Sequence, residues 1–370
     1  MPKIIKFNNC TAFGRLLIIC LVITVQSKSI SAQELQFYGI PEYGSRSIGM
    51  GLTGIIDAYG PLSILRNPAL NRTGKRVTIK PFFQWIGNGE WEDVTLIPRQ
   101  LNDMISPDNV SSATGLTSRY LGGVIQGRGF TLGYIHSNRK EFLFDKGLIT
   151  DIGIYTITPK YYGRRVKSDL LFAGYNLKFS SKGRIGFMLK NFQFRDTGNI
   201  STSLSSIVNR DGVDNFLNEI ESTKETTVAV DIGGLFGLSL LNKPVTIGFS
   251  LINVVSSDSA NEEPVPFYLN AGIAVVPLRN LLIEFNVIDI SDEDGMFSKT
   301  GKRIGIEYTM RGLRIRSGFY GDNLSFGLGV GGEGLSIDYG VMEIEHTNVI
   351  GRNNKESFQS IQVSLSGNFY

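Results

Sequence analysis

Cysteine and histidine are almost absent from this 370-residue chain, which has two of each. His136 and His346 lie far apart in the sequence, whereas a zinc site needs several such ligands at short spacings. No Gly-x-Ser-x-Gly elbow marks a nucleophile, and no glycine-rich phrase has the ending or the strand–turn–helix context of a nucleotide-binding loop. The sequence therefore predicts a non-enzyme without cofactor or metal, although counting leaves open a Ser-His-acid triad assembled in space.

Long hydrophobic runs are also absent. After residue 32 no apolar run reaches eighteen residues, whereas a membrane-spanning helix needs about 20. The chain contains no Pro/Ser-rich linker, charge block or low-complexity tract that would separate two domains. These absences argue against a helical membrane protein and favour one large domain.

The N-terminal residues 1–32 have the pattern of an export signal. The apolar stretch over 16–25 is too short to cross a bilayer as a helix, and small residues follow it. We predict cleavage after Ala32, with Ser31 as the alternative. A faint lipoprotein pattern ends at Cys20, but this cysteine lies inside the apolar stretch, so lipidation is the weaker interpretation.

Cleavage would change both the cysteine content and the charge. Cys10 and Cys20 both lie in the predicted signal, so the remaining chain would have no disulfide or thiolate. The signal carries four cations and no acid, and its removal takes the formal net charge from +3 to −1. The basic character thus belongs partly to the signal, and no nucleic-acid partner is expected.

What the chain does have is glycine, aromatic residues and alternation. Glycine occurs 43 times, and aromatic residues make up 11% of the sequence. Apolar side chains alternate with polar or small ones in five C-terminal segments, near 303–309, 313–320, 324–330, 335–341 and 361–369. A period of two places each set on one face of a strand. The sequence predicts an all-β fold, a transmembrane antiparallel β-barrel of about fourteen strands over residues 75–370.

Further strands are expected upstream, with less regular alternation. They lie near 75–86, 119–127, 129–137, 148–160, 166–180, 183–195, 224–239, 244–254, 266–276 and 280–290. In the segment 129–137 the alternation is partial, because Ile135 stands among the polar and small residues. The polar stretches 88–118, 197–222 and 255–265 are expected to include surface loops.

Two phrases near the predicted start of the exported chain carry a resemblance. They are the glycine-rich run from Gly44 to Gly54 and Asn67-Pro68-Ala69. Together with C-terminal phrases such as Gly305-Ile306-Glu307-Tyr308, they resemble the FadL-like outer-membrane superfamily, in particular its PorV/PorQ and TraF-like branch. The family pattern has an acidic residue or pair before Asn-Pro-Ala, where this chain has Arg66. The C-terminal aromatic assembly signal, Phe369-Tyr370, is shifted by one position, because Phe369 shares the apolar face.

The resemblance implies that residues 33–74 form a plug, or hatch, inside the barrel. Gly49 and Gly51 would allow close backbone approach and positive φ. Pro68 restricts Asn67 to extended or turn geometry, and Asn67 can bond its own backbone. For Asn67, Pro68 and Ala69 we favour a structural corner over direct ligand contact.

Charged residues on the predicted strands are expected to face the lumen, because charge facing lipid is costly. They are Glu284, Glu307, Arg314, Arg316 and Asp338. Glu307 is expected to pair across strands with Arg314 or Arg316. Such charges can line a pore or tie a plug to the wall, and we favour the second role.

The resemblance implies a place in the outer membrane of a Gram-negative bacterium. The leading hypothesis is a gated conduit for hydrophobic or other small molecules. The alternative is an interaction barrel that handles exported proteins for type IX secretion, and a structural or conjugation-associated role is a weaker third. The expected partners are outer-membrane lipid, the barrel assembly machinery, and either a hydrophobic ligand or secretion-system proteins.

Overall fold

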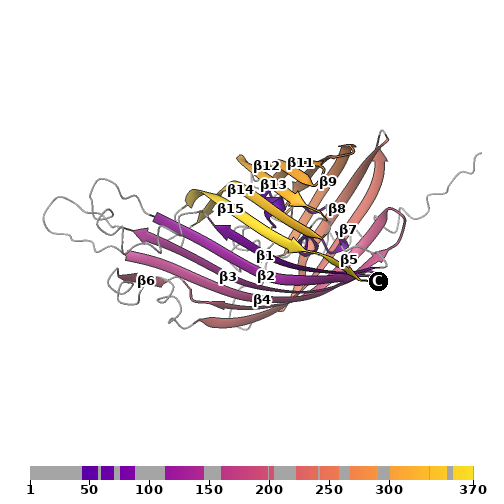
Figure 1. Cartoon of the computed structure of the whole chain (residues 1–370). Coiled ribbons are helices and arrows are strands. Elements are labelled where there is room, and N and C mark those ends of the chain that lie inside the picture. Colours follow the sequence, from indigo (N-terminus) through magenta and orange to yellow (C-terminus); the bar gives the residue numbers. More distant parts are fainter. Residues whose placement is uncertain are drawn as a thin grey trace, which may run out of the picture.

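A computed structural model of the chain shows a closed antiparallel β-barrel with short helices inside its curve (Figure 1). The structure describes residues 44–56, 60–70, 76–87, 113–145, 160–198, 200–203, 222–240, 242–257, 267–290, 301–332, 334–347 and 353–369. The predicted signal, residues 1–32, lies outside these ranges. None of the described helices is long and apolar enough to span a membrane.

Fourteen strands form the wall within the described ranges. They are β1 (Val77–Gly87), β2 (Ala113–Gly127), β3 (Phe130–Asp145), β4 (Lys160–Lys178), β5 (Gly183–Asp196), β7 (Thr223–Leu240), β8 (Lys243–Ser256), β9 (Tyr268–Leu278), β10 (Leu281–Val287), β11 (Lys302–Met310), β12 (Leu313–Tyr320), β13 (Asn323–Gly331), β14 (Leu335–Thr347) and β15 (Asn353–Leu365). Each pairs with its neighbour, and β15 pairs with β1 to close the barrel. The predicted fold class and strand count are confirmed.

Two short strands add to this wall. β6 (Ile200–Ser203) pairs with β4. β16 (Gly367–Phe369) continues β15 in register along β1, where Phe369 lies opposite Val77. The ladder is interrupted near Pro81, which has no N–H to donate, and the amide of Ser366 instead bonds Gly334 O at 2.8 Å. Tyr370, the second residue of the predicted assembly signal, lies outside the described residues.

Several strands extend beyond the predicted boundaries: β3 continues to Asp145, β4 begins at Lys160 and β15 begins at Asn353. β2 begins at Ala113, so the polar stretch expected over 88–118 is shorter than predicted. Residues 113–118 pair with β3, and their backbone groups are thereby satisfied without apolar alternation. The strand expected over 148–160 lies outside the described residues except for Lys160, where β4 begins.

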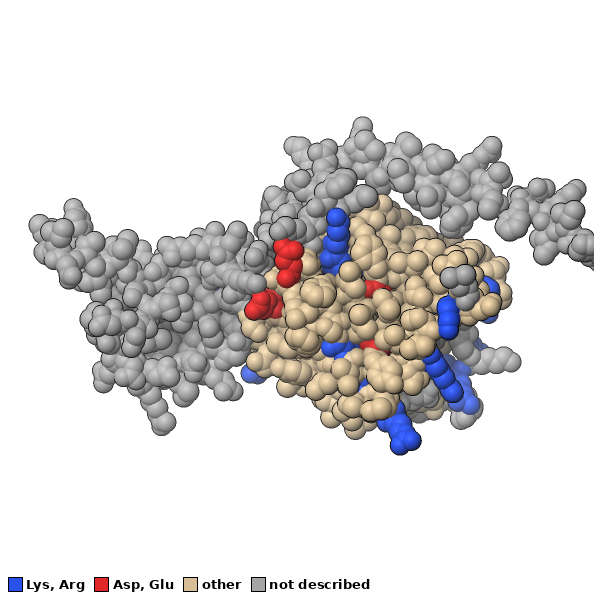
Figure 2. Space-filling view, turned by 90° about the horizontal axis from the view of Figure 1, so that it is seen from above, with Lys and Arg blue, Asp and Glu red and all other residues tan. Residues whose placement is uncertain are grey.

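Alternation divides the wall into an outward and an inward face. On β11 and β12, Ile304, Ile306, Tyr308, Ile315 and Phe319 are 42–49% exposed, whereas their neighbours in sequence are largely buried. Figure 2 shows one outer face of the barrel, most of it free of charge, with Lys and Arg mostly near its margins. This is the distribution expected for an apolar band facing lipid.

Three short helices lie on the inward side of the wall. They are α2 (Ser45–Gly49), α3 (Ser63–Arg66) and η3 (Pro68–Leu70). We call residues 44–56 and 60–70 the inner segment. It contacts β12 to β15 through α2, and β4, β5 and β7 through η3.

Candidate functional site

Paired glycines of the wall form the surface on which α2 lies. Gly305 is directly opposite Gly318 on β11 and β12, and Gly327 is opposite Gly340 on β13 and β14. A Cβ added to Gly318 would lie 2.6 Å from Met50 O, and one added to Gly327 would lie 2.8 Å from Gly49 Cα. Because these positions lack side chains, the inner segment lies directly on the wall backbone.

Gly49 and Gly51 make the matching approach from the inner segment. A Cβ on Gly49 would lie 2.6 Å from Gly327 Cα. Gly51 adopts φ +64°, and its amide donates to Ser325 Oγ at 2.7 Å. At this position positive φ and close packing both favour glycine.

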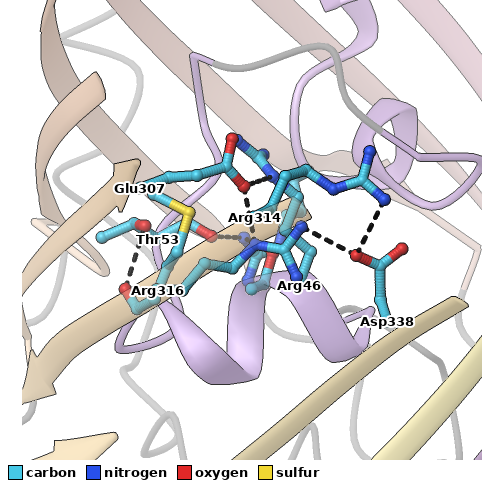
Figure 3. A network of polar contacts seen from close by, with 9 residues as sticks. Arg46, Thr53, Glu307, Arg314, Arg316 and Asp338 are labelled. Carbon is cyan, nitrogen blue, oxygen red and sulfur yellow. Dashed lines mark hydrogen bonds and ion pairs between the residues drawn. The ribbon is translucent and has the colours of Figure 1, made fainter. Parts of the chain in front are cut away.

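A buried ionic network joins the inner segment to three strands (Figure 3). Arg46 donates twice to Glu307, through Nε to Oε2 at 2.8 Å and through Nη2 to Oε1 at 3.0 Å. Glu307 Oε2 also accepts from Arg316 Nε at 2.6 Å. Arg316 Nη2 lies 2.7 Å from Asp338 Oδ1, and Arg314 Nη2 lies 3.6 Å from the same oxygen. The network thus brings together four of the five charged residues singled out in the sequence.

The charged side chains of this network are buried, so each of them depends on its partners. The side chain of Arg316 is fully buried, and those of Glu307 and Asp338 are 9% and 4% exposed. A buried ion whose partner is removed is left uncompensated at high cost. The network therefore constrains the position of α2 against β11, β12 and β14.

Glu284, the fifth of these charged residues, lies outside that network. Its Oε1 accepts from the amides of Gly54 at 3.0 Å and Ile56 at 3.2 Å, and from Asn286 Nδ2 at 3.1 Å. Its side chain is completely buried on β10. Glu284 thus accepts hydrogen bonds from two backbone amides of the inner segment that lie outside helices and strands.

Two arginines that sequence reasoning did not select also hold the inner segment. The guanidinium of Arg66 donates to Ser47 Oγ at 2.9 Å, to Leu52 O at 3.2 Å and to Thr53 O. Arg303 on β11 donates to the same Leu52 carbonyl at 3.2 Å. The sequence offered one sign of this role, because Arg66, just before Asn67, departs from the pattern of the superfamily that the chain resembles.

Asn67, Pro68 and Ala69 form a second attachment, on the other side of the barrel. Asn67 Nδ2 donates to Ile55 O at 2.8 Å and to Gly234 O at 3.3 Å, and Asn67 Oδ1 accepts from the amide of Ala69. Ala69 O in turn accepts from Asn176 Nδ2 at 2.7 Å. All the polar atoms of the Asn67 side chain are thus used in contacts within the chain.

Glycines again make room for this attachment. Gly186 on β5 lies opposite Gly233 on β7. A Cβ on Gly233 would lie 2.8 Å from Pro68 Cδ, and one on Gly186 would overlap the backbone between Pro68 and Ala69. The same device, a glycine pair on adjacent strands, therefore serves both attachments.

A cluster of apolar side chains lies on the inward face beside this second attachment. Leu62, Ile64 and Leu65 of the inner segment pack against buried side chains of β1 to β7. The wall contributes Phe82, Tyr120, Val124, Ile135, Leu170, Phe172, Met188, Phe192, Phe194 and Ala229. We call this set, with the three inner-segment residues, the apolar inner cluster.

A small polar cavity lies between the inner segment and the wall. Its volume is about 20 Å³, and Arg46, Arg66, Asp338 and Gln362 are among its lining residues. This volume is about that of one water. In the ranges that the structure describes, no group of three or more His, Cys, Asp or Glu could hold a metal ion.

The sequence matches no protein-family model and no curated protein. Its fold, however, is similar to that of the Ralstonia pickettii toluene transporter TbuX, with 11% identity, a TM-score of 0.51, and coverage of 89% of this chain and 98% of that chain. It is also similar to the monoaromatic hydrocarbon channel CymD, with 12% identity, a TM-score of 0.51 and coverage of 90% and 99%.

The Pseudomonas putida toluene transporter TodX is similar at 12% identity, with a TM-score of 0.50 and coverage of 88% and 97%. At such identities the similarity concerns the fold alone. The predicted PorV/PorQ or TraF-like branch stays a prediction. The chain therefore has a fourteen-strand barrel fold similar to that of these toluene transporters and this hydrocarbon channel.

Proposed function

We propose that this protein is a conduit for small hydrophobic molecules in the outer membrane of a Gram-negative bacterium, gated by residues 33–74 as a plug. The apolar inner cluster is the observation that carries this proposal. The interior of a membrane barrel is commonly polar, whereas here the inward face of β1 to β7 carries a cluster of ten apolar side chains, set among polar ones such as Lys190 and Asp231. Such a lining offers an apolar molecule a path with little loss of hydrophobic burial.

The solved structures with this fold support the same proposal. Their names describe transporters of toluene and channels for monoaromatic hydrocarbons. An uncharged aromatic molecule is therefore the first probe to test on this chain.

Gating requires that the inner segment move. Its ionic contacts lie on β11 to β14, whereas Leu62, Ile64 and Leu65 pack on β1 to β7, beside the neutral attachment of Asn67 and Ala69. A hydrophobic molecule would compete with Leu62, Ile64 and Leu65 for the apolar wall while the ionic contacts persist. We therefore propose that the plug opens on the apolar side and stays attached on the charged side.

A disulfide lock tests both parts of the proposal. Ser45 Oγ and Ser360 Oγ are 2.6 Å apart and buried, so Ser45→Cys with Ser360→Cys would tie α2 to β15. A second lock on the apolar side is Asn67→Cys with Gly233→Cys, because a Cβ at Gly233 would lie 3.0 Å from Asn67 Cγ. Uptake of radiolabelled toluene is measured in cells that make the full chain, with each single-cysteine variant as control.

We expect the apolar-side lock to block uptake until a reductant is added, and the Ser45–Ser360 lock to leave it nearly unchanged. Uptake that ignores both locks would contradict gating but leave the conduit standing. No uptake above cells lacking the protein would contradict the conduit itself.

The alternative is an interaction barrel for type IX secretion. The length and polarity of the sequence between β1 and β2, residues 88–112, favour it, because a protein partner needs an accessible polar surface. Purification in mild detergent followed by mass spectrometry separates the two functions. Secretion proteins at stoichiometric amounts without toluene uptake would support this alternative.

A further inference from the structure

Cations gather at one boundary of the outward face of β2, β4, β5 and β7. On β2, Leu121 is 62% exposed, and the next outward residue is Arg119. On β4, Leu171 is 53% exposed, and it is followed on the same face by Asp169 and then Lys167. The apolar band therefore ends at this boundary, and charged side chains begin one outward position beyond Leu121 and Leu171 and three beyond Leu189.

The cations occupy directly paired positions on successive strands. Arg119 lies opposite Asn138, Asn138 opposite Lys167, Lys167 opposite Arg195, and Arg195 opposite Lys224. We call Arg119, Lys167, Arg195 and Lys224 the cation row. Arg119, Arg195 and Lys224 are exposed and Lys167 is half-buried.

This arrangement is unfavourable for the protein alone. Like charges placed directly opposite on neighbouring strands destabilise a sheet, and the Lys167–Arg195 and Arg195–Lys224 pairs are of this kind. Lys140 and Arg165 form a further opposed pair beside them, and both of these residues, with Arg195, repel the charge of Lys167. The charge of Asp169 attracts Arg195, but among the residues that the structure describes no ion pair joins the four residues of the cation row to a carboxylate.

The boundary lies toward the end of the barrel that has the long connections. Residues 88–112, 146–159 and 204–222 connect strands at this end, whereas 128–129 and 241–242 connect them at the other. In outer-membrane barrels the short turns are periplasmic and the longer loops are extracellular. The cation row therefore falls at the headgroup level of the outer leaflet.

We propose that the cation row binds the phosphate groups of an anionic lipid in the outer leaflet of the outer membrane. Lipid phosphates beside neighbouring strands would offset the repulsion between opposed cations, and the exposed apolar residues below would contact the acyl chains. On the nearby strands β14 and β15, the exposed described residues at the same end are Glu343, Ser357 and Gln359, none of which is a cation. The lipid therefore binds beside β2 to β7, where the cation row lies. This inference requires the membrane barrel but not transport.

The test uses the full chain and the triple variant Lys167→Gln, Arg195→Gln, Lys224→Gln. The control, Lys182→Gln, Lys243→Gln, Arg311→Gln, removes the same charge from exposed positions at the short-turn end. Each protein is reconstituted in nanodiscs of neutral phosphatidylcholine with traces of lipid A or phosphatidylglycerol. Bound lipid is then counted by native mass spectrometry, and thermal unfolding is followed in parallel.

We expect the parent and the control to retain lipid A. The triple variant should bind lipid A on the order of a hundredfold more weakly at low salt, because each of the three lost cations contributes about 1 kcal/mol. In neutral lipid the triple variant should unfold at a higher temperature than the parent, because the like charges are gone. Equal lipid retention by all three proteins would overturn the proposal, as would an unfolding temperature of the variant below the parent's in neutral lipid. If inorganic phosphate alone raised the unfolding temperature of the parent as much as lipid A does, the row would bind free anions. This result would likewise overturn a lipid site.

Discussion

The two sides of the barrel interior hold the same inner segment by different means. On β11 to β14 the contacts are ionic and backbone-directed, with Glu307 between two arginines and glycine pairs beneath α2. On β1 to β7 they are mostly apolar, with Leu62, Ile64 and Leu65 in the apolar inner cluster. Ionic contacts have strict geometry and little tolerance for displacement. Apolar packing is non-directional, and it can be replaced by a hydrophobic molecule. The charged side is thus suited to anchoring and the apolar side to release.

The largest effect is expected from removing the carboxylate shared by the two arginines. Glu307→Ala leaves Arg46 and Arg316 without their common partner in a buried site, which typically costs about 3–5 kcal/mol. Urea unfolding in detergent micelles, followed by tryptophan fluorescence, measures this loss. Glu343→Ala on the exposed face of β14 is the control and should cost less than about 1 kcal/mol. If the Glu307→Ala protein were as stable as the control, the ionic contacts on the charged side would not anchor the inner segment.

Converting the charged side to an apolar one sharpens the same comparison. Buried ion triads replaced by apolar residues of similar volume are often as stable or more so. The variant Arg46→Met, Glu307→Leu, Arg316→Met should therefore recover most of the stability lost in Glu307→Ala. If charge supplies geometry rather than stability, this variant should unfold normally but show faster proteolysis within residues 44–70.

The next effect belongs to the apolar side. Leu65→Ala removes a buried side chain, 5% exposed, from the apolar inner cluster, and such truncations cost about 2–5 kcal/mol. The control is Leu132→Ala on the outward face, 51% exposed, where lipid replaces the lost contacts. Under the proposed function, Leu65→Ala should also raise toluene uptake, whereas Glu307→Ala should make it leaky to polar solutes. Unchanged uptake in Leu65→Ala would argue against release on the apolar side.

A smaller effect is expected at the glycine pairs. Gly318→Ala would place a Cβ 2.6 Å from Met50 O, a backbone atom, so α2 must shift. Overpacking of this kind costs about 1–3 kcal/mol. Gly334→Ala has no atom within 4 Å of its added Cβ and is the matched control. Equal stability of the two variants in urea would show that α2 tolerates displacement and does not depend on a bare backbone surface.

Alternation in the sequence predicted the charged half of the barrel better than the apolar half. On β13 every second residue is apolar and exposed, and the intervening residues are polar or glycine, and β11 and β12 follow this pattern except at Lys302 and Ser317. Both faces can therefore be assigned from period alone. On β3 the alternation was partial because Ile135, 1% exposed, faces an apolar interior. Where apolar side chains lie on both faces of a strand, a period of two does not indicate which face points into the barrel.

Contacts between distant segments could not be derived from the sequence. Glycines 305 and 318 were placed on one face of their strands, but their direct pairing depends on strand register, and their role depends on α2 lying on them. Arg66 and Arg303 meet at the carbonyl of Leu52, although 237 positions separate them. A single sequence gives no register between such segments, so residues of each segment could be selected in advance but not paired with their distant partners.

The smallest effect tests whether hydroxyl groups add to the anchoring on the charged side. Ser360 Oγ is 2.6 Å from Ser45 Oγ and accepts from Gln84 Nε2 at 3.1 Å, so it joins α2, β1 and β15. Ser360→Ala removes these bonds and should cost about 0.5–1.5 kcal/mol, the usual net value of a neutral hydrogen bond. Ser357→Ala, exposed on the outward face of the same strand, is the control and should change little. Urea unfolding of both variants in micelles gives the comparison. A Ser360→Ala cost as large as that of Glu307→Ala would mean that hydroxyl contacts, rather than charge, hold α2 to the wall.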